Sequence, residues 1–342
     1  MTARRAFPLE AYVGVYFLVY LPNVIITKLI TSLPRGAGVP PLTGLETLPA
    51  SLILNAILTY LFIWFAGWYR DAHTVTVGGR TLPVPTRYTV LSGIGTALIL
   101  FTVPLSFTFK GVSIPFIQLL MRGDILIIAP LVDLIYGRRV RWWSWTALGL
   151  VALALAITLH ARGGLNLPPL AILTVVLYTL GYFIRLAVMT RVAKTGEPAS
   201  VRRYFVEEKL VALPLSVALL AAVSASGIGG QSGELGFGFI TIWSDPVMVW
   251  IGLIAVTLTA ISIFSAIILL DVRENAYCVP LERASSLLAG IAGSILLAWG
   301  WGLRMPSPAE LTGAVILIAA IVLLSVAPRF GAAGRRALAE AQ

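Results

Sequence analysis

Long apolar runs recur along almost the whole chain, and they limit its fold more than any other feature of the sequence. A run of about 20 apolar residues lets an α-helix cross the hydrocarbon core of a bilayer. Only 12% of the residues are charged, whereas soluble domains carry about 25%. Ten such runs lie at 11–31, 47–68, 88–109, 112–136, 142–160, 168–189, 205–226, 247–270, 277–299 and 307–327. The sequence therefore predicts an all-α membrane protein with ten transmembrane helices.

The basic residues predict the orientation of these helices. If the N-terminus is inside, the inner segments hold 17 Lys and Arg residues and the outer segments hold four. Loops rich in Lys and Arg stay on the cytoplasmic side, so both termini are expected in the cytoplasm. The same bias accounts for the net charge of +10, which therefore predicts no nucleic-acid partner.

Weak internal similarity divides the chain into two halves of five helices. At an offset of 162 residues, a polar stripe of the first helix lies over one of the sixth: Tyr16, Tyr20 and Asn23 over Tyr178, Tyr182 and Arg185. At an offset of 161, Arg122 lies over Arg283. Because each half has an odd number of helices, the second enters the membrane from the opposite side, as in many transporters. We expect a first repeat at 1–163, an inverted second repeat at 164–330 and a cytoplasmic tail at 331–342.

Together these features resemble the drug/metabolite transporter superfamily. The fourth run ends in "DLIYGRR" before the polar, aromatic start "RWWSWTALG", and "VPLERASSLLAGIAGS" is followed by "PSPAELTGAVILIAA". The resemblance covers about 10–327 and implies a carrier or exporter in the cell membrane, which is the inner membrane in a Gram-negative cell. Many members carry a Gly-Glu pair after helices four and nine. Here Gly137-Arg138 and "WGWGLRM" stand at those places, so the branch of the superfamily is left open.

Charged side chains inside the predicted helices are the main candidates for function. A charge at the bilayer centre costs about 2.5–3.5 kcal/mol on insertion scales. Arg122 is expected about 15 Å deep in the fourth helix, with Gln118 on its face and Asp124 on the opposite face. Glu282 and Arg283 lie in the equivalent ninth helix. Pairing of Asp124 with Arg283, or of Glu282 with Arg122, would be structural, and recognition of a substrate is the other interpretation.

The tyrosine stripes, Tyr16 with Tyr20 and Tyr178 with Tyr182, also have two interpretations. Their side chains either line a cavity or form hydrogen bonds between helices. Lys28 is expected to extend outward or to line the same cavity, and the Gly-rich "SGIGGQSGELGFGF" is expected to be a flexible loop. Charged residues near the predicted helix ends are expected to be wetted: Asp133, Glu207, Glu208, Lys209, Asp271 and Glu274. The predicted substrate-binding residues are Gln118, Arg122, Asp124, Glu282, Arg283, Tyr16, Tyr20, Asn23, Tyr178, Tyr182 and Arg185.

Three classes of function compete. Inverted halves, deep charges and mid-helix prolines that loosen helices favour a transporter. The two histidines, His73 and His160, lie on opposite sides, and no H-E-x-x-H or G-x-S-x-G motif occurs. No enzyme activity, catalytic residue, metal or cofactor is therefore expected. A channel or a structural membrane protein remains an alternative, as does a drug or cation efflux carrier.

The balance of interior charge predicts the class of substrate. Arg122, Arg185 and Arg283 outnumber Asp124 and Glu282, and guanidinium groups bind carboxylate and phosphate through paired donors. We expect a small organic anion or zwitterion, carried by alternating access. Protons are a candidate coupling ion, in which case Asp124 or Glu282 carries the proton.

Overall fold

The computed structural model describes most of the chain. The described residues are 8–35, 38–105, 121, 125–161, 169–227, 231–303, 305, 308–309, 311–313, 315–316, 318–320, 322–324 and 326–327. Gln118, Arg122 and Asp124 lie outside them, so the predictions for these three residues stay predictions.

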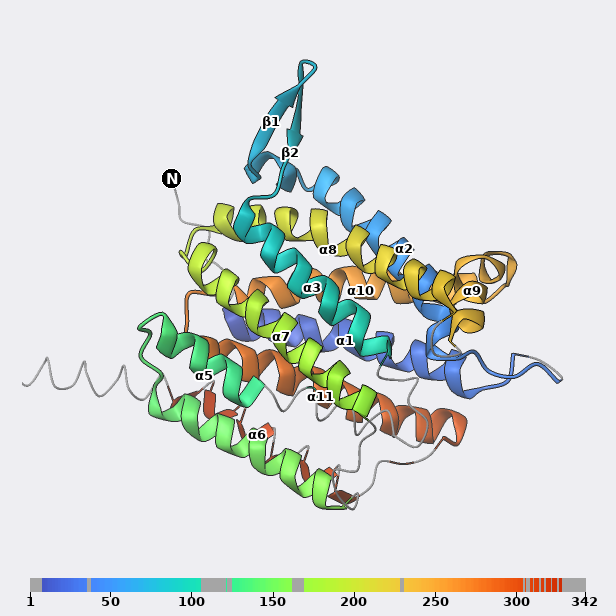
Figure 1. The fold of residues 1–342 in the computed structure, drawn as a ribbon. Helices are drawn as coiled ribbons and strands as arrows, with labels where there is room; N and C mark the ends of the chain where they lie inside the picture. The colour runs from blue at the N-terminus through green and yellow to red at the C-terminus, as the bar shows by residue number, and fades with distance from the viewer. Residues whose placement is uncertain are drawn as a thin grey trace, which may run out of the picture.

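The described part of the chain is all-α except for one small hairpin (Figure 1). The α-helices are α1 (Leu9–Ser32), α2 (Gly44–Phe65), α3 (Arg87–Leu105), α5 (Ile125–Ile135), α6 (Trp142–Ala161), α7 (Pro169–Val192), α8 (Pro198–Ser226), α9 (Ser232–Phe239), α10 (Met248–Leu269) and α11 (Asn275–Trp301). Single 3-10 turns are η1 (Trp68–Asp71) and η4 (Thr241–Ser244), and the hairpin strands are β1 (Thr74–Val77) and β2 (Arg80–Pro83).

Among the described residues, seven helices are long and apolar enough to cross a membrane: α1, α2, α6, α7, α8, α10 and α11. Each coincides with a predicted span, and the chain is a multi-pass membrane protein. Shorter apolar helices at Arg87–Thr102 and Leu311–Leu324 fall in the third and tenth predicted spans. The fourth predicted span is described only at residue 121 and from 125 onward, where α5 forms. The predicted number of ten is thus not shown by the described residues.

Close packing between α3 and α7 depends on two glycines. A Cβ atom on Gly95 would lie 2.7 Å from the carbonyl oxygen of Gly181, and one on Gly181 would lie 2.6 Å from the oxygen of Gly95. Small residues at such crossings let helix backbones approach each other in membranes. The α3 helix also packs on α8, while α1 packs on α10 and α11.

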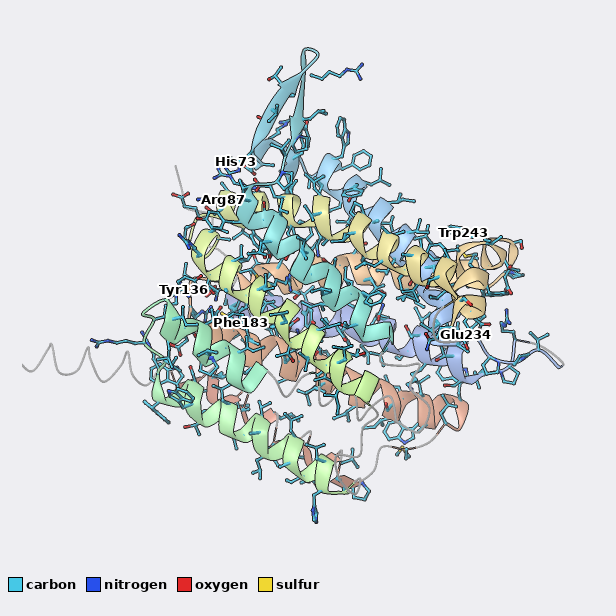
Figure 2. All side chains as sticks on the ribbon, viewed as in Figure 1. His73, Arg87, Tyr136, Phe183, Glu234 and Trp243 are labelled. Atoms are coloured by element: carbon cyan, nitrogen blue, oxygen red, sulfur yellow. The ribbon has the colours of Figure 1, made fainter. Side chains whose placement is uncertain are left out.

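The two ends of the bundle carry different loops. Figure 2 places His73, Arg87 and Tyr136 at one end and Glu234 and Trp243 at the other. This division agrees with the sides that the basic residues predict, with the first three inside and the last two outside.

The hairpin between α2 and α3 is held by a tight Gly-Gly turn. Gly78 and Gly79 both have positive φ, +60° and +79°, which two-residue hairpin turns of type I′ require. The strands pair Val75 with Leu82 and Thr76 with Thr81. In Figure 1 the hairpin leaves the bundle across the direction in which the helices run.

The expectation of a flexible loop across the Gly-rich segment is wrong for its second half. Ser232–Phe239 forms α9, which packs on α2 and α8. Leu235 is buried, and Gly238 lies so close to α2 that a Cβ would be 2.5 Å from the carbonyl oxygen of Glu46. Tertiary packing therefore outweighs the weak helix propensity of glycine here.

Candidate functional site

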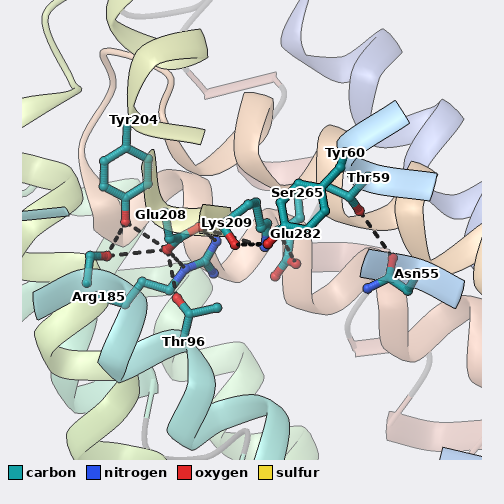
Figure 3. Close-up of polar contacts among 11 residues, drawn as sticks. Asn55, Thr59, Tyr60, Thr96, Arg185, Tyr204, Glu208, Lys209, Ser265 and Glu282 are labelled. Atoms are coloured by element: carbon teal, nitrogen blue, oxygen red, sulfur yellow. Dashed lines mark hydrogen bonds and ion pairs between the residues drawn. The ribbon is translucent and has the colours of Figure 1, made fainter. Parts of the chain in front are cut away.

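A buried carboxylate, Glu208 in α8, is the centre of a polar cluster (Figure 3). Its Oε1 accepts hydrogen bonds from Arg185 Nε at 2.7 Å, Thr96 Oγ1 at 2.7 Å, the Tyr204 hydroxyl at 2.9 Å and Ser92 Oγ at 3.3 Å. Its Oε2 accepts from Arg185 Nη2 at 3.4 Å. The cluster joins α3, α7 and α8 through a charge that is fully satisfied, as burial of an ion requires.

Lys209 adds a second cation to this cluster. Its Nζ lies 3.8 Å from Glu208 Oε2 and 5.5 Å from the centroid of the Phe205 ring. The side chain is only 7% exposed. One buried carboxylate therefore faces two buried cations, Arg185 and Lys209.

The prediction that Glu207, Glu208 and Lys209 are wetted is wrong. All three are buried, because α3, α7 and the segment just before α3 pack around this part of α8. The helix begins at Pro198 rather than near residue 205, so Glu208 lies ten residues, about 15 Å, from its start. Glu207 accepts a hydrogen bond from Thr89 Oγ1 at 2.8 Å.

A second buried carboxylate, Glu282 in α11, is the centre of a cluster between α1, α10 and α11. Its Oε1 accepts hydrogen bonds from the Tyr16 hydroxyl at 2.8 Å and from Ser265 Oγ at 3.0 Å. Arg283 Nε lies 3.2 Å from its Oε2. Tyr16, Glu282 and Arg283, three predicted site residues, are thus in one place.

Arg283 reaches from this cluster to α7. Its guanidinium carbon lies 4.7 Å from the centroid of the Tyr182 ring, which is within the range of a cation–π contact. Tyr182 and Arg185 are three residues apart on α7 and therefore neighbours on one face. The Glu208 and Glu282 clusters hence meet along the Tyr182 face of α7.

Buried polar atoms without a hydrogen bond concentrate at this meeting point. Among the described residues, four buried side-chain atoms make none, and three of them are the Tyr182 hydroxyl, Glu282 Oε2 and Arg283 Nε. Buried polar groups are nearly always hydrogen-bonded in folded proteins. Glu282 Oε2 and Arg283 Nε face each other as an ion pair at 3.2 Å without hydrogen-bond geometry, and the Tyr182 hydroxyl lies beside them, so a polar ligand or water could complete the hydrogen bonds at this point.

The other predicted site residues that the structure describes either stack within a tyrosine stripe or join neighbouring helices. Tyr20 packs on Tyr16 with ring centroids 5.5 Å apart, and Tyr178 packs on Tyr182 at 6.1 Å. Asn23 donates to Thr257 Oγ1 at 2.8 Å and to a backbone carbonyl of α10, so it ties α1 to α10. Lys28 is exposed, as the outward-pointing interpretation expected.

Asp133 is buried too, which contradicts the expectation of interfacial solvation. Its carboxylate accepts a hydrogen bond from the Ala276 backbone N–H and one from Asn275 Nδ2, both at 2.8 Å. Asp133 therefore caps the N-terminus of α11 from α5, where negative charge favours the helix dipole. Nearby, Lys194 Nζ donates to the Arg273 carbonyl at 2.8 Å, and burial lowers the pKa of Lys194.

The described site is built from carboxylates, guanidinium groups and hydroxyls. Within the described ranges, no group of three or more His, Cys, Asp or Glu residues could hold a metal ion. The single cysteine, Cys278, is buried at the start of α11. The clusters instead supply fixed charges and hydroxyls inside a helix bundle.

Comparison with known proteins finds a similarity of fold but no similarity of sequence to a known family. The sequence matches none of the family models and none of the curated proteins compared with it. It is similar to a protein of known crystal structure with a TM-score of 0.61 and 14% sequence identity, over 94% of this chain and 97% of that one. At this identity the likeness concerns the arrangement of the helices.

Proposed function

We propose that this protein is a secondary transporter of a small organic anion or zwitterion in the cell membrane, with both termini in the cytoplasm. In this proposal it has the ten-helix architecture of the drug/metabolite transporter superfamily. Two shorter apolar helices and α5 lie in the three predicted spans that the seven long helices leave, which supports ten crossings.

The pattern of helix contacts supports two inverted repeats. If α1, α2, α3 and α5 correspond to α7, α8, α10 and α11, the contact of α3 with α7 corresponds to that of α10 with α1. By the same rule, the contact of α3 with α8 corresponds to the contact of α10 with α2. The contact of α5 with α7 corresponds to the contact of α11 with α1. Both members of each pair are present, as expected for two equivalent halves.

Polar contacts follow the same correspondence. Thr96 and Glu208 join α3 to α8, and Thr259 Oγ1 donates to Asn55 Oδ1 at 2.9 Å to join α10 to α2. In transporters built from inverted repeats, the substrate site lies where the two halves meet. In the proposed arrangement that interface contains Glu208 and Glu282.

The observation that carries the proposal is a buried ion pair, Glu282 with Arg283 at 3.2 Å, whose facing atoms lack hydrogen bonds, as does the hydroxyl of the neighbouring Tyr182. A carboxylate on the ligand would accept from Arg283, and an ammonium group would donate to Glu282. The Arg283 side chain is 18% exposed, although its Nε atom is buried. Among the described residues the interior charges balance, because four cations face four carboxylates: Arg185, Lys194, Lys209 and Arg283 against Asp133, Glu207, Glu208 and Glu282.

A counterflow assay tests the proposal. Purified protein is screened against metabolite pools by thermal shift, and the stabilising compounds are then used in liposomes, where only a carrier shows substrate-accelerated exchange. We expect Arg283→Gln to abolish exchange and the exposed Arg70→Gln to leave it unchanged. Exchange of cationic dyes that is unaffected by Arg283→Gln would favour a cation efflux carrier instead.

If transport is coupled to protons, we propose Glu282 as the described carrier of the proton. Glu208 is paired with two cations, Arg185 and Lys209, whereas Glu282 is paired with one, Arg283, and accepts hydrogen bonds from two hydroxyl groups. Proton coupling that persists in Glu282→Gln would exclude this assignment and leave Asp124 as the predicted alternative.

A further inference from the structure

The hairpin between α2 and α3 has one apolar and one polar face. Antiparallel pairing puts Val75 and Leu82 opposite each other, and side chains alternate between faces along a strand. Arg80, two residues before Leu82, therefore shares their face, while Thr76 and Thr81 share the other. Val75 and Leu82 are 48% and 50% exposed, so no described part of the chain covers the apolar face.

The hairpin leaves the bundle at the height of the membrane surface. Its base is fixed to Glu207 of α8, whose Oε1 accepts from the His73 backbone N–H at 3.0 Å and whose Oε2 accepts from the Thr86 N–H at 3.2 Å. Glu207 lies nine residues after Pro198, the start of α8. That distance is more than two turns, so α8 continues past the hairpin on the water side.

Aromatic and basic residues also indicate that the hairpin lies at the level of the membrane surface. Trp64 and Phe65 at the end of α2 are 66% and 82% exposed, and exposed aromatic residues at helix ends lie at the level of the lipid headgroups. Arg70, Arg80 and Arg87 surround the hairpin and are exposed. In Figure 1 the hairpin extends across the direction of the helices, which is along the plane of a membrane that the helices cross.

We propose that this hairpin lies on the cytoplasmic membrane surface and binds anionic lipid. Val75 and Leu82 enter the boundary between headgroups and acyl chains, Arg80 binds the headgroup phosphates, and the threonine face remains in water. Apolar burial combined with basic charge is the way that interfacial segments bind anionic membranes. The side of the membrane follows from the proposed topology, whereas the contact itself does not depend on transport.

Spin labels on the two faces test the contact. Single cysteines replace Val75, Leu82, Thr76 or Thr81 in full-length Cys278→Ser protein, reconstituted in nanodiscs of phosphatidylcholine with or without phosphatidylglycerol. Collisions of each label with oxygen, which enters lipid, and with a water-soluble nickel chelate are then compared. We expect a high oxygen-to-nickel ratio at positions 75 and 82, a low ratio at 76 and 81, and a larger contrast with phosphatidylglycerol.

A charge variant tests the role of the headgroups. Arg80→Gln is expected to lower the membrane-bound fraction of the hairpin in phosphatidylglycerol discs roughly fivefold, the effect of one basic residue near an anionic surface. Arg139→Gln, an exposed arginine of another inner loop, serves as the matched control and should have no effect.

Two results would overturn the proposal. If all four labels collide freely with the nickel chelate in both lipid compositions, the hairpin lies in water. If the labels at 75 and 82 are shielded from both reagents, a second protein chain covers the apolar face. Neither readout requires transport, so these results are separate from a failure of the counterflow assay.

Discussion

At the scale of single residues, the buried pair of Glu208 and Arg185 is expected to dominate stability. Glu208→Gln would leave Arg185 and Lys209 as buried cations without a counter-charge, and breaking a buried ion pair costs about 3–5 kcal/mol. We expect a clear loss of thermal stability in detergent. The exposed Glu197→Gln is the control, and an equal melting temperature for both variants would contradict this account.

A double variant separates loss of charge from loss of packing. Glu208→Gln with Arg185→Gln removes one of the two uncompensated cations, so part of the lost stability should return. Residues in one network are not additive, and a double variant less stable than both single variants would mean that hydrogen-bond geometry rather than charge dominates.

Glu282 and Arg283 could be found from the sequence because they interrupt a long apolar run. Glu208 could not, because the polar segment from Pro198 to Tyr204 hides the true start of α8. Pro198 occupies the first turn of the helix, a position where proline is favoured, and that signal would have extended the predicted span.

At the scale of elements, contact between α3 and α7 depends on backbone approach at two glycines. Gly95→Ala and Gly181→Ala each place a Cβ against a carbonyl oxygen of the other helix. We expect each to destabilise the protein by about 1–3 kcal/mol, as overpacking does. The matched control is Gly149→Ala in α6, where a Cβ meets nothing within 4 Å, and thermal unfolding should show no loss for it.

Among the elements, the apolar helices were predicted and the hairpin and α9 were not. Length and hydropathy are properties of each run alone, so the seven long spans coincide with the prediction. The hairpin did carry a local signal, since "TVTVGGRTLP" places alternating residues around Gly-Gly. The α9 helix carried none, because its glycines are held by contacts with α2 and α8.

At the scale of the whole molecule, the decisive prediction concerns orientation in the membrane. The 17-to-4 distribution of Lys and Arg and the separation of loops between the two ends of the bundle (Figure 2) agree on one topology. The segment between α7 and α8 should be cytoplasmic, and the segment between α9 and α10 should be outside.

Cysteine labelling in intact cells tests this orientation. In a Cys278→Ser background, Glu197→Cys should react with an impermeant maleimide only after permeabilisation, whereas Ser244→Cys should react in intact cells. Both side chains are exposed, so access to the reagent depends on the side of the membrane. Reaction of Glu197→Cys in intact cells would mean that the orientation is inverted, with the starts of α8 and α11, seven to ten residues from Glu282 and Glu208, on the outside.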